Sequence, residues 1–451
     1  MIWLTVRGSS ESNPVVLHGV TAVPGDKSIS HRALMLGALA DGTGRIEGFL
    51  PSGDCLATLG CMRQLGVEIE HAAAGSSTTL IVHGRGLRGL EAPIVPLDCR
   101  RSGTTMRLLA GILAGQAFDS VLTGDPQLLR RPMRRITQPL SAMGARIEET
   151  DGHGPLVIHG QSKLRGSDHV LAVASAQVKS AILLGGLYAD GPVTVQLPGP
   201  ARDHTERMIA AQVEYLVGGP SPLTYDMCAA RLDPAGIRRL RSINRVVPGD
   251  VSSAAFLIAA ALMLPGSEVT IIGVGVNETR TGLLDVLSEM GADLALGDRR
   301  EQGGEPIADI RIRASAIRPA EIQGDTVVRM IDEFPILVVL ATQAEGTTVV
   351  RDAAELRVKE TDRIATVAVE LSKMGASIEP RPDGFVVNGP TQLTGGEVDS
   401  HGDHRLSMAL AIAGLVAKGK TTVLGAGCIP DSFPGFVGAL NSLGADLRHG
   451  V

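Results

Sequence analysis

One short pattern recurs along this chain: a helix-like apolar segment ends in Leu or Met, a glycine follows, and a strand-like alternating segment begins. The five glycines are Gly66, Gly144, Gly291, Gly375 and Gly444. Glycine suits the residue after a helix, because the backbone there takes a positive φ. The gaps are 78, 147, 84 and 69 residues, so a degenerate sixth copy is expected in the long gap, near Gly218. The spacing predicts six α+β units of roughly 75 residues, in two domains of three units each.

Each predicted unit contains a second helix, which has a polar start and an apolar body. These helices are expected within 24–40, 102–115, 175–189, 249–264, 332–344 and 402–417. Because they are apolar nearly all round, they are expected to be buried inside their domains. The start of a buried helix carries unpaired N–H groups and a partial positive charge. Several such starts facing one cleft would form an anion site.

Composition narrows the classes of function. The net charge is −6 and aromatic residues make up 2% of the chain, which argues against a general nucleic-acid or membrane-surface binder. The five scattered cysteines form no C-x-x-C pair, and no metal-ligand spacing such as H-E-x-x-H occurs, so neither a disulfide framework nor a metal site is expected. The apolar stretches are too short for a membrane span, and the first residues lack the apolar core of a signal peptide. These features predict a cytoplasmic protein.

Basic residues gather at the predicted helix starts and in polar loops. They are Lys27, Arg32, Arg100, Arg101, Arg107, Lys179 and Arg405 at or near helix starts, and Arg130, Arg131, Arg202, Lys359 and Arg363 in loops. Arginine binds phosphate and carboxylate groups through a permanently charged fork, although for any single arginine a solvated surface charge or a local ion pair is the favoured explanation. Lys27 is the strongest candidate, because it follows Pro-Gly-Asp at a helix start.

Acidic candidates lie in two polar segments, Asp332 and Glu333 before an apolar helix and Glu360 and Asp362 between basic residues. A carboxylate beside cations is held ionised, as a proton acceptor requires. Asp332 is equally well explained as a helix cap, and Glu360 as an exposed ion-pair partner on a helix. Cys99, beside two arginines, is either a reactive thiol or a bystander, and the second interpretation is favoured.

Ten motifs, taken together and in order, resemble the 5-enolpyruvylshikimate-3-phosphate synthase family of enolpyruvyl transferases. They are PGDKSISHR (24–32), SGTTMR (102–107), LTGDPQLLRRPM (122–133), SAQVKSA (175–181), ARDHTERM (201–208), PGDVSSAAF (248–256), MIDEFP (330–335), RVKETDR (357–363), GDHRLSMA (402–409) and SFPGF (432–436). The resemblance implies a two-domain inside-out α/β barrel of six βαβαββ repeats. The first domain would span 25–247 and the second 1–24 with 248–451, with the active site in the cleft between them.

The resemblance also implies an activity in the shikimate pathway, which leads to chorismate and the aromatic amino acids. The enolpyruvyl group of phosphoenolpyruvate would pass to the 5-hydroxyl of shikimate 3-phosphate, through a tetrahedral intermediate that loses phosphate. No metal or organic cofactor is implied, and a monomer is expected. A further implication is that the herbicide glyphosate targets the enzyme, since Gly103 is the small residue typical of sensitive forms.

Site residues are carried over motif by motif. The implied ligands of shikimate 3-phosphate are Lys27, Ser28, Arg32, Ser175, Ala176, Gln177, Arg202, Asp332 and Lys359. The implied ligands of phosphoenolpyruvate are Lys27, Gly103, Arg131, Gln177, Arg363 and Arg405. The implied catalytic residues are Asp332, which would accept the proton of the 5-hydroxyl, and Lys27 and Glu360, which would transfer protons to and from the methylene carbon.

The sequence departs from the family pattern at three places. Arg100-Arg101 replaces a usual Gly-Asn pair, whose Asn helps to seat phosphoenolpyruvate. Ala201 replaces a common Ser, and Asp431 stands where some members have a Lys. The departures at Arg100-Arg101 and Asp431 predict a modified phosphoenolpyruvate half-site, with one cation missing where some members have the Lys.

Two other functions remain to be weighed. An enolpyruvyl transferase acting on UDP-N-acetylglucosamine would share the fold, but it typically has a Lys-Asn pair near the N-terminus and a cysteine in the loop that here spans 123–132 and contains Arg131. A non-catalytic anion-binding protein of the same fold would be free to lose Lys27, Asp332, Glu360 or Arg405, all of which are present.

Overall fold

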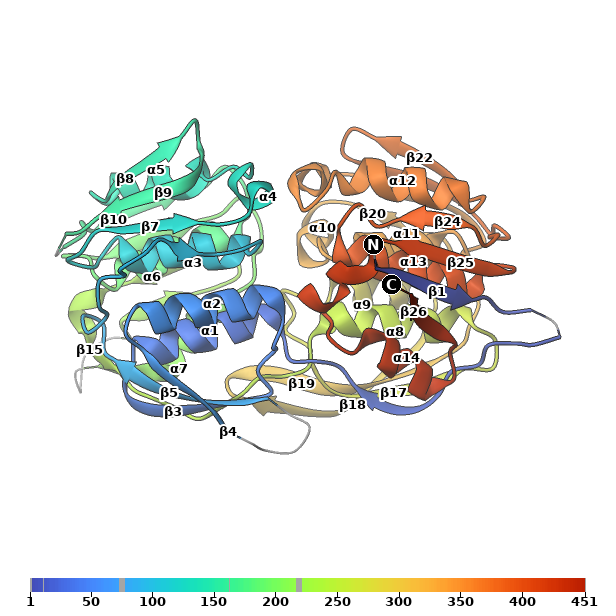
Figure 1. Ribbon diagram of the computed structural model, residues 1–451, viewed down its shortest axis with the longest axis horizontal. Coiled ribbons are helices and arrows are strands. Elements are labelled where there is room, and N and C mark those ends of the chain that lie inside the picture. The colour runs from blue at the N-terminus through green and yellow to red at the C-terminus, as the bar shows by residue number, and fades with distance from the viewer. Residues whose placement is uncertain (1, 11, 73–77, 162, 216–220, 451) are drawn as a thin grey trace. The chain divides into compact units, whose positions relative to one another are not determined.

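The computed structural model describes residues 2–10, 12–72, 78–161, 163–215 and 221–450. The chain divides into two compact units, coloured by residue number in Figure 1. Unit 1 consists of Met1–Pro24, Pro248–Glu301 and Pro306–Val451, and unit 2 of Gly25–Val247 with Gln302–Glu305. A four-residue segment, 302–305, therefore groups with unit 2 although the strands on either side of it belong to unit 1.

Unit 2 begins with the helix that carries Lys27. Its helices are α1 (Lys27–Ala38), α2 (Gly53–Gln64), α3 (Gly103–Leu113), α4 (Pro126–Leu129), α5 (Arg134–Ala142), α6 (Ala176–Gly186), α7 (His204–Gln212) and the 3₁₀ helix η1 (Pro234–Gly236). Its strands are β3 (Asp41–Glu47), β4 (Glu68–Ala72), β5 (Thr79–Arg85), β6 (Leu97–Asp98), β7 (Ser120–Thr123), β8 (Arg146–Thr150), β9 (His153–His159), β10 (Ser167–Val170), β11 (Val193–Gln196), β12 (Val213–Tyr215), β13 (Leu223–Tyr225), β14 (Ala229–Leu232), β15 (Ile237–Leu240) and β16 (Arg245–Val246).

Three sheets of unit 2 share one strand order, β16-β3-β5-β4, β6-β7-β9-β8 and β10-β11-β14-β13. In each, the first two strands are parallel and the remaining neighbours antiparallel. A parallel pair needs a crossover connection, which a buried helix provides in the second and third sheets. The third repeat adds a small sheet of β12 and β15. Figure 1 shows α1 and α3 between the sheet of β3 and the sheet of β7.

Unit 1 repeats the arrangement with strands from distant parts of the chain. Its helices are α8 (Val251–Met263), α9 (Gly282–Glu289), α10 (Asp325–Arg329), α11 (Phe334–Ala341), α12 (Arg363–Lys373), α13 (His404–Val416), α14 (Phe436–Leu443) and the 3₁₀ helices η2 (Ala354–Val358) and η3 (Ala426–Asp431). Its strands are β1 (Trp3–Arg7), β2 (His18–Ala22), β17 (Glu268–Gly275), β18 (Asp293–Gln302), β19 (Glu305–Arg313), β20 (Glu321–Ile322), β21 (Gly346–Val350), β22 (Ser377–Arg381), β23 (Gly384–Gly389), β24 (Glu397–Asp399), β25 (Lys420–Leu424) and β26 (Leu447–Gly450).

The sheets of unit 1 have the orders β2-β17-β19-β18, β20-β21-β23-β22 and β24-β25-β1-β26. The N-terminal strand β1 lies between β25 and β26 and is antiparallel to both. The next strand, β2, pairs in parallel with β17, which follows all of the main segment of unit 2. The described residues thus contain six four-stranded sheets with one order, and the predicted α/β fold of six βαβαββ repeats is confirmed.

The recurrent glycines occupy the position that the sequence pattern predicts. Gly66, Gly144, Gly291, Gly375 and Gly444 have φ values between 83° and 118°, and each follows a helix and precedes a strand. The sixth copy, expected near Gly218, lies outside the described residues.

The six expected apolar helices are α1, α3, α6, α8, α11 and α13, and most residues of each are buried. They contribute to two hydrophobic cores, one in each unit. Among the described residues, no helix combines the length and the apolar character that crossing a membrane requires. Burial of whole helices leaves their first turns as the places where polar side chains can collect.

Candidate active site

The start of α1 carries the first candidate cation of unit 2. The Asp26 carboxylate caps the helix by accepting a hydrogen bond from the Ile29 backbone N–H at 2.8 Å. Lys27 follows, and its Nζ lies 3.2 Å from Oδ2 of Asp54 at the start of α2. Both side chains keep about a sixth of their surface exposed. The ammonium group of Lys27 is therefore positioned by an ion pair and still open to solvent.

One turn further along α1, Arg32 is held by three hydrogen bonds. Its Nε donates to Thr205 Oγ1 at 2.7 Å, its Nη2 to Ser180 Oγ at 2.8 Å and its Nη1 to the Ser28 carbonyl at 3.0 Å. Burial lowers the pKa of Arg32 to about 10, so the guanidinium stays protonated near neutral pH. These contacts fix the orientation of the planar fork before any ligand arrives.

The starts of α3 and α6 are linked through Gln177. Its Oε1 accepts a hydrogen bond from Arg107 Nη1 at 2.7 Å, and its Nε2 donates to Thr104 Oγ1 at 3.0 Å. The hydroxyl groups of Ser102 and Ser175 cap the two helices. The predicted ligands Ser175, Ala176 and Gln177 therefore form the first residues of one buried helix and its cap.

Gly103, the first residue of α3, faces two guanidinium groups. A Cβ atom at this position would lie 2.9 Å from Arg107 Nη1 and 3.2 Å from Arg131 Nη1. The structure thus brings Gly103 and Arg131 together, as the sequence predicts for a shared ligand. It adds Arg107, which the predicted ligand sets omit.

Lys179 is a correction to the interpretation of basic residues at helix starts as anion ligands. Its side chain is fully buried, and its Nζ lies 2.6 Å from Oε1 of Glu206, which is also fully buried. Both charges belong to the interior of unit 2, on α6 and α7. Lys179 is a structural cation there.

Cys99 is not suited to act as a nucleophile. Its side chain is buried, and burial raises the pKa of the thiol well above its usual value. The thiolate, which is the nucleophilic form, is therefore disfavoured. The favoured interpretation of Cys99 as a bystander agrees with this environment.

The departure at Arg100-Arg101 has a visible backbone consequence. Arg100 takes a φ of 50°, in the left-handed region that favours the glycine usual at this place in the family. The neighbouring Arg101 donates from Nε to Gln127 Oε1 at 2.8 Å. Ala201 is buried just before Arg202 and α7, and Asp431 ends η3 in unit 1.

In unit 1, a fully buried arginine gathers three carboxylates. Arg363, the first residue of α12, donates from Nε to Asp403 Oδ2 at 2.8 Å and from Nη2 to Glu360 Oε2 at 2.7 Å. Its Nη1 lies 3.6 Å from Asp332 Oδ1. Burial by itself lowers the pKa of Arg363, but the carboxylates of Asp403 and Glu360 raise it above its ordinary value. The guanidinium is permanently charged.

Arg405 approaches the same carboxylate from α13. Its Nη2 lies 3.7 Å from Asp332 Oδ2, and its Nη1 lies 3.9 Å from Glu333 Oε1. The side chain of Asp332 keeps 17% of its surface exposed between the two guanidinium groups. We call Asp332, Glu360, Arg363, Asp403 and Arg405 the unit 1 cluster. Both guanidinium groups face the Asp332 carboxylate, an arrangement that favours its ionised form.

A buried polar network lies behind this cluster. Ser252 on α8 donates to Glu333 Oε1, and Arg280 Nη2 donates to Ser252 Oγ at 2.9 Å and to Asp250 Oδ1 at 3.2 Å. These residues fix Glu333, which in turn faces Arg405. Sequence reasoning missed Asp403, Ser252 and Arg280 as members of the site. Asp403 and Asp250 carried one usable signal, an aspartate directly before an apolar helix.

Lys359 completes the predicted residues of unit 1. Its side chain is partly buried, and desolvation lowers the pKa of its ammonium group although Asp332 opposes the shift. The structure therefore brings Asp332, Glu360, Arg363 and Arg405 together, with Lys359 within electrostatic reach of them. The predicted residues of unit 2 lie at the starts of α1, α3 and α6 and in the adjoining loops.

Comparison with known proteins identifies the family of this chain. The family model described as EPSP synthase (3-phosphoshikimate 1-carboxyvinyltransferase) matches residues 12–440. A 3-phosphoshikimate 1-carboxyvinyltransferase of Geobacillus kaustophilus is 50% identical over 436 residues, covering 96% of this chain and 99% of the relative. One from Halorhodospira halophila is 52% identical over 433 residues, covering 96% and 95%. The solved EPSP synthase of Acinetobacter baumannii is 42% identical and covers 100% of both chains with a TM-score of 0.87. This chain belongs to the EPSP synthase family.

Proposed function

We propose that this chain is a transferase that moves the carboxyvinyl group of phosphoenolpyruvate to the 5-hydroxyl of shikimate 3-phosphate and releases phosphate. The family membership supports this reaction, and its relatives bear its name. One observation on Arg363 adds support for this reaction. Nη1 of Arg363 is buried and makes no hydrogen bond to any described residue. A buried donor of this kind carries a desolvation cost that an anionic ligand would offset.

The unit 1 cluster suits the first proton transfer of the reaction. The Asp332 carboxylate is ionised and accepts the proton of the 5-hydroxyl as the oxygen attacks C2 of phosphoenolpyruvate. The cations on either side of Asp332 also attract the phosphate and carboxylate groups of phosphoenolpyruvate. When those anions bind, they offset the guanidinium charges, and the carboxylate becomes a stronger base than it is in the free protein.

The second proton transfer occurs at the methylene carbon of phosphoenolpyruvate. In our proposal, Glu360 and Lys27 supply a proton to this carbon during the addition and remove one during the elimination. Loss of phosphate from the tetrahedral intermediate then restores the double bond. Glu360 is held by Arg363, and Lys27 by Asp54, so each group has a fixed partner.

We assign the substrates to the residues as follows. Shikimate 3-phosphate is bound by Lys27, Ser28, Arg32, Ser175, Ala176, Gln177, Arg202, Asp332 and Lys359. Phosphoenolpyruvate is bound by Lys27, Gly103, Arg131, Gln177, Arg363 and Arg405. Each unit contributes residues to both of these ligand sets. The guanidinium groups of Arg32 and Arg363 support the assignment, since each is already oriented by neighbouring groups.

An assay of phosphate release from phosphoenolpyruvate, dependent on shikimate 3-phosphate, tests the reaction. We expect release without any added metal or cofactor. If no phosphate appears with shikimate 3-phosphate but it does with UDP-N-acetylglucosamine, the related transferase reaction is the correct one. The relatives do not favour that alternative. A monomer in the cytoplasm is the accompanying proposal from the family, and size-exclusion chromatography with light scattering checks the monomer.

Glyphosate is expected to inhibit the enzyme, and Gly103→Ala to weaken both inhibition and phosphoenolpyruvate binding. The added methyl group would displace the Nη1 atoms of Arg107 and Arg131 from their positions. We expect the KM for phosphoenolpyruvate to rise several-fold while the KM for shikimate 3-phosphate changes little. Steady-state kinetics with and without millimolar glyphosate measure both effects. A wild-type rate that millimolar glyphosate leaves unchanged would contradict the prediction.

A further inference from the structure

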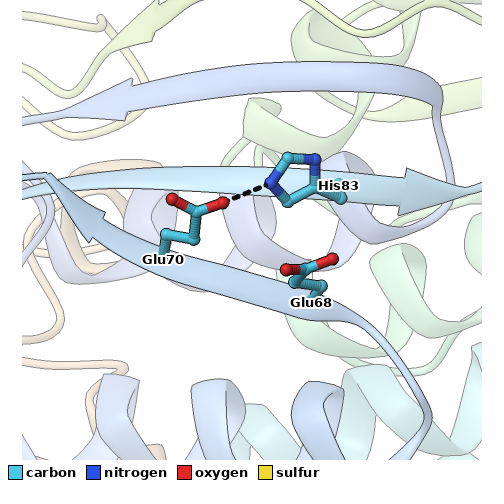
Figure 2. A group of neighbouring side chains, drawn as sticks. All are labelled: Glu68, Glu70 and His83. Atoms are coloured by element: carbon cyan, nitrogen blue, oxygen red, sulfur yellow. Dashed lines mark hydrogen bonds and ion pairs between the residues drawn. The ribbon is translucent and has the colours of Figure 1, made fainter.

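The outer face of the first sheet of unit 2 carries three side chains that the reaction does not use. In the register of strands β3, β5 and β4, Thr43 lies opposite His83, and His83 lies opposite Glu68. Glu70 is two residues beyond Glu68, so it projects from the same face. Figure 2 shows the two carboxylates and the imidazole ring grouped above this strand pair.

The geometry of this group is close to that of a metal site. His83 Nε2 lies 2.9 Å from Glu70 Oε1. One ligand atom from each of Glu68, Glu70 and His83 lies within 4.8 Å of the others. Ligands around a zinc ion at about 2.0–2.2 Å are roughly 3–3.5 Å apart, so small rotations of the exposed glutamate side chains would complete the site.

The imidazole ring is oriented by a group outside the cluster. His83 Nδ1 lies 3.0 Å from Thr43 Oγ1 on the neighbouring strand β3, which turns Nε2 toward the carboxylates. Metal-binding histidines are commonly held in this way through the second ring nitrogen. The position of Thr43 follows from the strand register and is independent of the two glutamates.

An ion pair between His83 and Glu70 explains only part of the arrangement. The Glu68 carboxylate has no hydrogen bond or ion pair to any described residue, and the nearby cation Arg45 pairs with Glu47 at 2.8 Å. Two carboxylates beside one imidazole leave negative charge that a divalent cation would neutralise. One nitrogen and two carboxylate ligands suit a transition metal such as Zn²⁺, with water at the open positions.

We propose that Glu68, Glu70 and His83 form a surface site for a divalent transition-metal ion, represented by Zn²⁺. The ion ties the edge strand β4 to β5 near the first residue of β4. The sequence did not reveal this site, because its ligands are 2 and 13 residues apart and strand register, rather than a helical spacing, brings them together. None of its three ligands is among the proposed transferase residues, so we expect its occupancy to be independent of that reaction.

Isothermal titration of the untagged full-length protein with zinc chloride tests the proposal. We expect one zinc ion to bind in the micromolar range, and magnesium not to compete. His83→Gln and Glu68→Gln each lower the affinity by about tenfold or more, and Thr43→Val, which removes the orienting hydroxyl, by about tenfold. Circular dichroism should show that these surface variants remain folded.

His159→Gln is the matched control. His159 also lies on the last strand of a hairpin, between the carboxylates of Asp119 and Glu148, but it does not join a three-ligand group among the described residues. We expect its zinc affinity to stay within about twofold of wild type, far less than the loss of a ligand. Equal zinc binding by wild type and His83→Gln, or an equal loss in His159→Gln, would overturn the proposal.

Discussion

Asp332→Asn is expected to lower kcat by about 10²–10⁴-fold, because the amide cannot accept the proton of the attacking hydroxyl. The substitution is nearly isosteric, and Asp332 lies at the partly exposed side of the unit 1 cluster, 3.6 Å and 3.7 Å from its two arginines. Removing the negative charge of Asp332 makes the net charge around Arg363 and Arg405 more positive. We therefore expect the KM for phosphoenolpyruvate to stay the same or fall while kcat collapses.

Single-turnover and steady-state assays of phosphate release separate these two effects. Asp325→Asn is the control, since Asp325 is an exposed carboxylate of the same unit at the start of α10. Its kinetics should match those of the wild type. Full activity in Asp332→Asn would exclude Asp332 as the proton acceptor, whereas an equal rise in both KM values would assign it to substrate binding alone.

The repeat architecture could be predicted because its signals are local. Gly66 and its four counterparts mark helix ends where a positive φ is required, and apolar helices reveal themselves through composition alone. The partners of β1, β2 and β16 could not be predicted in this way. Each completes a sheet whose other strands are distant in sequence, and short strands carry no signal of register.

The site was predictable where motif and helix start coincide, as at Lys27, Gln177 and Arg405. The prediction failed where the partner of a residue comes from another helix or strand. Lys179 sits beside Ser180 and Gln177 on α6, yet Glu206 on α7 neutralises it in the interior. The same limit hid the network of Ser252 and Arg280, whose meaning depends on Glu333. Local sequence shows which residues begin a helix, but not which charges meet across helices.

The ion pair of Lys179 and Glu206 gives the largest expected effect on stability. Lys179→Met should lower the free energy of unfolding of unit 2 by about 3–5 kcal/mol, because it leaves the Glu206 carboxylate buried without its cation. The double variant Lys179→Met/Glu206→Leu removes both charges and keeps similar volumes. Its stability should lie within about 1 kcal/mol of wild type or above it.

Urea unfolding followed by circular dichroism measures these differences, with the exposed Lys163→Met as a control expected to change stability by less than about 0.5 kcal/mol. A single variant as stable as this control would mean that the pair is not buried in solution.

The double variant also tests whether Lys179 contributes to ligand binding as well as to stability. Ser180 and Thr205, the neighbours of the pair in sequence, hold Arg32, so a well-packed double variant should keep its phosphate-release activity. If it is stable but inactive, Lys179 acts on the substrates, and its assignment as a structural cation is wrong.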